Sequence, residues 1–187
     1  KVLICLIDGL GPDYIAASEM PVLKKLMRTA AYRVGKGVMP SLTNVNNASL
    51  ATASFPESHG ITANTFFDPQ RNQIVELSAP SYLRAPTLFA AAHRRQLRTA
   101  WVSAKEKVRL LLGHQAHVNT SAEREGVPMY DAANTDWVFD RARSLLHRQN
   151  IDILYLTTTD YMMHTYAPHS APSLAHLSKL DRHLANI

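Results

Sequence analysis

The run Lys1-Val2-Leu3-Ile4-Cys5-Leu6-Ile7, followed at once by Asp8, decides the fold class. Its apolar residues are continuous, a pattern typical of a strand that is covered on both faces, as in a parallel sheet. In open α/β sheets, ligands bind at the carboxyl ends of the strands. The sequence therefore predicts an α/β fold with a mostly parallel sheet, and it places Asp8 where a carboxylate can hold a metal ion. Seen alone, such an Asp is more often a turn or capping residue.

The same strand pattern recurs along the chain between segments with helical spacing. Strands are expected at Thr99–Val102 and Ile151–Leu156, and Tyr32–Met39 is expected to lead back into the sheet. The polar, irregular segment His114–Met129 is expected to be a surface loop. Helices are expected over Met20–Ala31, Pro86–Arg94, Asn134–Leu146 and Ser170–Ile187, and a hairpin over Phe66–Leu77.

Composition narrows the class of protein. The chain has 187 residues, of which 46% are hydrophobic, so one compact domain over residues 1–187 is expected. The single cysteine excludes a disulfide framework and favours a cytoplasmic protein. No apolar run is long enough to span a bilayer. The net charge of +5 comes from scattered Lys and Arg without a nucleic-acid-binding motif, so we expect neither a nucleic-acid nor a membrane partner.

A second candidate position lies in Met39-Pro40-Ser41-Leu42-Thr43, which reads as a loop that turns into a short helix. Thr43 would then stand at a helix N-terminus, where backbone N–H groups suit a phosphate-like anion. Its hydroxyl can attack phosphorus only if its pKa is lowered, for which a metal ion is one of few devices. An ordinary capped loop–helix junction is an equally good interpretation of this segment alone. Asn64, in an extended piece, could return beside Thr43 and donate to a phosphoryl oxygen.

Two more pairs follow predicted strands. Asp160 and His164 are four residues apart, so one helical turn puts carboxylate and imidazole on the same face, although a cap and a core histidine give the same spacing. Lys105 and Lys107 stand where a strand becomes a helix and could converge on an anionic substrate group. Solvated surface lysines are the more ordinary interpretation of such a pair.

The order of these elements resembles the alkaline phosphatase superfamily, and within it the phosphonoacetate hydrolases, near relatives of the type I phosphodiesterases/nucleotide pyrophosphatases. The resemblance covers nearly all of the chain. It is carried by a strand ending in Asp8, by Pro40-Ser41-Leu42-Thr43-Asn44, by His59-Gly60-Ile61 with Asn64, by Ala104-Lys105-x-Lys107, and by Asp160-x-x-x-His164. The contexts of Thr43 and of Lys105 point to the phosphonoacetate branch.

This resemblance implies a three-layer sandwich of alkaline phosphatase type that binds two zinc ions. Asp8 and Thr43 would ligate one zinc, and Asp160 and His164 the other. Asn64 would bind the phosphoryl group, and Lys105 and Lys107 would hold the substrate carboxylate. The family's later Asp-His pair and distal His have no counterpart before Ile187, so we expect a C-terminally incomplete domain whose metal sites need further ligands.

The resemblance implies a zinc-dependent hydrolase that cleaves the carbon–phosphorus bond of phosphonoacetate through a phosphothreonine on Thr43, giving acetate and phosphate. The expected partner is a small anionic phosphonate, and homodimerisation is left open. One alternative is a phosphodiesterase or nucleotide pyrophosphatase that uses the same Thr and metals. The other is a catalytically incomplete binding or structural domain.

Overall fold

The computed structural model describes all 187 residues, and its centre is a sheet of four parallel strands. The strands lie side by side in the order β1 (Val2–Leu6), β6 (Ile153–Thr157), β4 (Thr99–Ser103) and β5 (Val118–Ser121). Leu6 and Ser103 both pair with Thr157, so the carboxyl ends of three strands lie level. The predicted α/β class with a mostly parallel sheet is confirmed.

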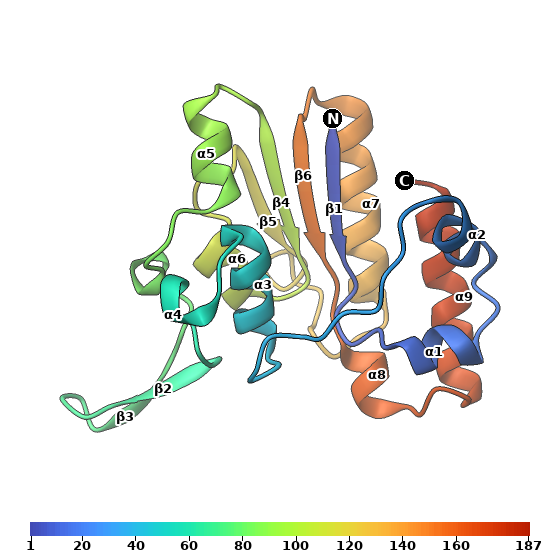
Figure 1. Cartoon of the computed structure of the whole chain (residues 1–187), viewed down its shortest axis with the longest axis horizontal. Helices are drawn as coiled ribbons and strands as arrows, with labels where there is room; N and C mark the ends of the chain where they lie inside the picture. The colour runs from blue at the N-terminus through green and yellow to red at the C-terminus, as the bar shows by residue number, and fades with distance from the viewer.

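Helices cover both faces of this sheet, as Figure 1 shows. On one side stand α7 (Ala133–Arg148) and α9 (Ala171–Ala185), and on the other α3 (Thr43–Thr52), α5 (Leu88–Arg94) and α6 (Glu106–Leu112). The remaining elements are α1 (Pro12–Ala17), α2 (Pro21–Thr29), α4 (Pro56–His59), the 3-10 helix Pro80–Tyr82, α8 (Tyr161–Thr165), and the antiparallel hairpin of β2 (Thr65–Asp68) and β3 (Gln73–Glu76).

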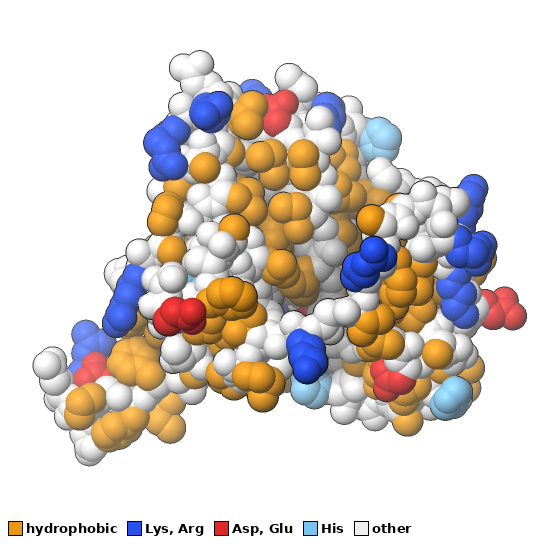
Figure 2. Space-filling view, viewed as in Figure 1, with side chains coloured by type: hydrophobic (Ala, Val, Ile, Leu, Met, Phe, Trp, Pro, Cys, Tyr) orange, Lys and Arg blue, Asp and Glu red, His pale blue; other side chains and the backbone are white.

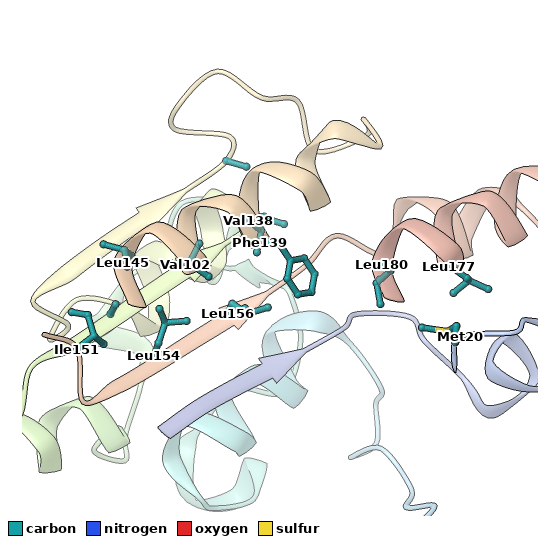
Figure 3. Packing of buried hydrophobic residues seen from close by; sticks show 14 of the residues in the cluster. Met20, Val102, Val138, Phe139, Leu145, Ile151, Leu154, Leu156, Leu177 and Leu180 are labelled. Atoms are coloured by element: carbon teal, nitrogen blue, oxygen red, sulfur yellow. The ribbon is translucent and has the colours of Figure 1, made fainter. Parts of the chain in front are cut away.

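Each face of the sheet has its own hydrophobic core, because successive side chains of a strand point to opposite faces. Val102 and Leu156 pack with residues of α7 and α9, a cluster drawn in Figure 3. Trp101 and Tyr155 pack on the other face with residues of α3, α5 and α6, and their rings stack with centroids 4.3 Å apart. The two clusters give the three-layer sandwich expected from the resemblance.

Two expectations about strands were wrong. Tyr32–Met39 forms no strand, and Thr43 therefore follows an irregular, largely exposed segment. The segment carries two glycines and two basic residues, which weaken strand formation. Conversely, the expected loop His114–Met129 contains β5, which pairs with β4.

The strand β1 lies at one edge of the sheet and is only partly covered. Val2 is 52% and Leu3 is 36% exposed. Figure 2 shows hydrophobic side chains gathered on this side of the molecule, over the strands drawn in Figure 1.

Among the helices, none combines the length and the apolar character that crossing a membrane requires.

Candidate functional site

A cavity of about 780 Å³ opens at the carboxyl ends of the strands and is lined in part by residues of α3 and α8. All seven side chains selected from the sequence line it, although they come from five separate segments: Asp8, Thr43, Asn64, Lys105, Lys107, Asp160 and His164. Carboxyl ends of parallel strands meet at one edge of a sheet, which explains why residues so far apart in sequence share this cavity.

The end of β1 brings Asp8 close to the segment after β6. The backbone N–H of Asp8 donates to Oγ1 of Thr158 at 3.1 Å. Gly9 then takes a positive φ of 78°, and a Cβ at this position would lie 3.1 Å from the Cβ atoms of Asp160 and Met163. A glycine is therefore needed here both for its backbone conformation and for the close approach of the two segments.

Thr43 is the first residue of α3, as expected, and its hydroxyl faces Asp8. The Oγ1 atom donates to Asp8 Oδ2 at 3.2 Å. Asn47, one turn later, donates to the carbonyl of Thr43 at 3.0 Å and accepts from the hydroxyl of Tyr155 at 3.0 Å. These two bonds tie the start of α3 to the central strand β6, so the Thr43 hydroxyl stands on a rigid support at the positive end of the helix dipole.

Asn64 returns beside Thr43, as its sequence position suggested. Its Oδ1 accepts the backbone N–H of Asn44 at 3.1 Å, which satisfies one of the unpaired donors at the start of α3. Because the oxygen of the amide faces that donor, the two N–H groups of Asn64 remain for a ligand in the cavity.

Lys105 lies at the centre of the site, buried to 6% exposure. Its Nζ donates to Asp8 Oδ2 at 3.0 Å, to Thr43 Oγ1 at 3.1 Å and to Asp160 Oδ1 at 2.7 Å. Burial alone would lower the pKa of Lys105, but the Asp8 charge and the hydrogen bond to Asp160 outweigh it, so the pKa is raised. The ammonium is therefore charged and joins both carboxylates to the Thr43 hydroxyl.

The pair Asp160 and His164 has the geometry that its spacing predicts. His164 Nε2 lies 2.9 Å from Asp160 Oδ2, and the imidazole is 74% exposed whereas the carboxylate is 16% exposed. Burial would raise the pKa of Asp160, but the hydrogen bond and the charge of Lys105 lower it below its usual value.

Lys107 lines the same cavity but has a different partner from Lys105. Its Nζ lies 3.9 Å from Oε1 of the exposed Glu76.

The donor atoms present fit a metal ion in kind and fall short in number. Two carboxylates, a hydroxyl and an imidazole are ligands that zinc accepts, and Asp8 and Asp160 already bind one cation, the Lys105 ammonium. No three of the histidine, cysteine, aspartate and glutamate side chains lie close enough to share a metal ion. Asp8 with Thr43, and Asp160 with His164, would each supply part of a coordination shell.

Sequence reasoning missed three residues of the site. Gly9 and Asn47 act through neighbours, and only the folded structure reveals their close contacts. Tyr130 lines the cavity with a ring that is 69% exposed and lies edge-on to Tyr161, with centroids 6.1 Å apart. Its place within a polar segment beside Met129 gave no signal in the sequence.

The chain matches the family model of the type I phosphodiesterases/nucleotide pyrophosphatases over residues 2–187. Among solved structures, it is similar to phosphonoacetate hydrolase from Sinorhizobium meliloti in complex with phosphonoacetate, with 34% identity and a TM-score of 0.88 over 99% of this chain. The murine ectonucleotide pyrophosphatase/phosphodiesterase 5 superposes with a TM-score of 0.74 at 20% identity over 99% of this chain, which indicates the shared fold.

Among curated proteins, rat ectonucleotide pyrophosphatase/phosphodiesterase family member 1 is 24% identical over 96% of this chain. The chain spans about half the length of the structures it matches, 52% of the bacterial hydrolase and 50% of the murine protein, and 20% of the rat protein.

Proposed function

Since the chain belongs to the type I phosphodiesterase/nucleotide pyrophosphatase family, we propose that the protein is a metal-dependent phosphonoacetate hydrolase. In this proposal, the enzyme cleaves the carbon–phosphorus bond of phosphonoacetate to acetate and phosphate through a phosphothreonine on Thr43. The observation that carries it is that Asp8, Thr43 and Asp160 all contact the Lys105 ammonium, in a cavity that Asn64 and Lys107 also line. The 34% identity to a phosphonoacetate hydrolase over nearly the whole chain supports this choice of substrate.

The two proposed cations are zinc ions, held in part by Asp8 with Thr43 and by Asp160 with His164. When bound, zinc supplies Lewis acidity, which lowers the pKa of a nearby hydroxyl and offsets charge on a phosphoryl oxygen.

Each remaining role in the reaction is assigned to a residue of the chain itself. Thr43 Oγ1, which lies 3.2 Å from Asp8 Oδ2, loses its hydroxyl proton to water and attacks phosphorus, and it takes up a proton again when the phosphothreonine is hydrolysed. The amide N–H groups of Asn64 and the N-terminus of α3 hold the phosphoryl oxygens. The bond from phosphorus to carbon breaks, and its electron pair goes to the acetate carbanion, which delocalises into the carboxylate. A positive charge at Lys107 stabilises that carboxylate, and water then protonates the carbon and hydrolyses the phosphothreonine.

A comparison of two substrates tests this proposal. With zinc supplied, we expect the purified protein to release phosphate from phosphonoacetate and to cleave an aryl phosphodiester much more slowly. Lys107→Ala should lower kcat/KM for phosphonoacetate by about tenfold or more relative to the diester, because only phosphonoacetate carries the carboxylate. Lys25→Ala, an exposed lysine on α2, is the matched control. Equal losses on both substrates in Lys107→Ala would refute the carboxylate-binding role.

A second candidate function is supported by Tyr130. Its exposed ring at the cavity could stack on a nucleobase, which would suit a phosphodiesterase or nucleotide pyrophosphatase. Faster turnover of the aryl diester than of phosphonoacetate, lost in Tyr130→Ala, would favour this alternative. If the protein binds no zinc, the interpretation as a non-catalytic binding or structural domain would be favoured.

We also propose a cytoplasmic location for the protein.

A further inference from the structure

Lys105 differs from every other lysine of the chain in how many hydrogen bonds its ammonium group donates. An ammonium group has three N–H donors, and all three have acceptors here: Asp8, Thr43 and Asp160. The side chain is 7% exposed, and those of Asp8 and Asp160 are 19% and 16% exposed. In this arrangement Lys105 has no donor left for a substrate, so its proposed role in binding the substrate carboxylate requires it to move.

The charges around Lys105 give a reason for such a movement. Asp8 and Asp160 bring two negative charges into a largely desolvated place, and one ammonium compensates only one of them. Without any cation, the carboxylates would repel each other and lose hydration, which is costly. A divalent cation compensates both charges, so it can replace the ammonium at these oxygens.

The ammonium and a metal ion also need the same atoms. Nζ contacts Asp8 and Thr43, proposed for one zinc, and Asp160, proposed for the other. A zinc ion held by these oxygens would place a second cation beside the ammonium. Like charges at such separations repel strongly where water is scarce.

We propose that Lys105 is an internal counter-cation, which holds Asp8, Thr43 and Asp160 together in the metal-free protein and is displaced from them when a metal ion binds. The inference rests on the proposed function, since it takes these residues to be metal ligands. The displaced ammonium remains in the cavity with Lys107, two residues along the same segment, where both can reach a substrate carboxylate. Metal loading would thereby switch Lys105 from a structural to a substrate-binding role.

Metal affinity of matched variants tests this inference without measuring turnover. In competition with a chromogenic chelator, Lys105→Met should bind zinc about tenfold tighter than the wild type, because no ammonium competes for the carboxylates. The metal-free form of this variant should unfold at a lower temperature than the wild type. Lys25→Met, which changes an exposed lysine of α2 outside the cavity, should match the wild type in both measurements. Unchanged or weaker zinc binding in Lys105→Met would overturn the inference.

Lysine acylation in the wild-type protein gives a second test that needs no variant. Mass spectrometry should find Lys105 protected in the metal-free protein and labelled several times faster once zinc is bound, with Lys107 labelled in both states. Zinc binding with Lys105 still protected would overturn only the inference about Lys105. Failure to bind any zinc would overturn both this inference and the proposed function.

Discussion

Gly9 sets the spacing between the segments that carry Asp8 and Asp160. Because a Cβ at Gly9 would lie 3.1 Å from Asp160 Cβ, Gly9→Ala should push Asp160 away from its partners and weaken zinc binding. The variant should also lose roughly 1–2 kcal/mol of unfolding free energy from its positive φ. Chelator competition and denaturant unfolding measure the two effects.

Gly126 provides the control for this prediction. It has a φ of 84°, similar to that of Gly9, and a Cβ there would meet nothing within 4 Å. Gly126→Ala should therefore show the loss of stability without the loss of zinc affinity. Equal zinc affinities in the two variants would contradict the assigned role of Gly9.

At the scale of single residues, the sequence predicted which side chains would meet but not how they would pair. Asp8 and Asp160 could be selected because each follows an apolar strand, and Thr43 because it starts a helix. The partners of Lys105 could not be predicted, since a lysine side chain has a long reach and several rotamers, and its final position depends on hydrogen-bond acceptors contributed by three remote segments.

At the scale of elements, one hydrogen bond connects α3 to the sheet. The hydroxyl of the buried Tyr155 on β6 donates to Asn47 Oδ1, and Asn47 holds the carbonyl of Thr43. Tyr155→Phe should cost roughly 1–3 kcal/mol of unfolding free energy, because it leaves a buried acceptor without a partner. Denaturant unfolding measures this loss. Tyr32→Phe, which changes a more exposed ring, should leave stability unchanged, and a similar loss in both variants would count against the assigned bond.

The strands that the sequence predicted correctly are those with continuous apolar runs. Residues of β4 and β6 are buried on both faces of the sheet, and residues of the edge strand β1 also pack on both faces although that strand is only partly covered. In β5, Val118-Asn119-Thr120-Ser121 is short and polar, and it is a strand because β4 offers a partner. Tyr32–Met39 shows the reverse case, since its apolar residues found no such partner. Pairing between remote segments decided both outcomes.

At the scale of the whole molecule, acid sensitivity should arise far from the cavity, where α9 packs against α7. His176 on α9 is 4% exposed, and burial, together with the charges of Lys179 and His183, lowers its pKa to about 4, while Asp136 of α7 opposes this shift. The unfolded chain therefore takes up a proton near pH 6.5, well before the folded protein does. Stability is fully present above about pH 6.5 and should fall by roughly 2–3 kcal/mol as the pH drops to 4.

Unfolding experiments across this pH range check the prediction. His176→Gln should flatten the dependence between pH 6.5 and pH 4, because the titrating group is removed. His147→Gln, at an exposed position of α7, should leave the dependence unchanged. A wild-type curve that stays flat over this range would contradict the burial of a neutral His176.

The proposed reaction depends on Thr43 as the nucleophile at a site that remote segments of the molecule share. Thr43→Ala should reduce phosphate release by a factor on the order of a thousand or more while zinc still binds in part, since Asp8, Asp160 and His164 remain. The most direct measurement is acid quenching of the zinc-loaded protein during turnover of phosphonoacetate, followed by mass spectrometry of the peptide that contains Thr43. We predict a phosphoryl group on Thr43 that is absent from Thr43→Ala. Full turnover without any phosphorylation of Thr43, or turnover unchanged in Thr43→Ala, would contradict the account.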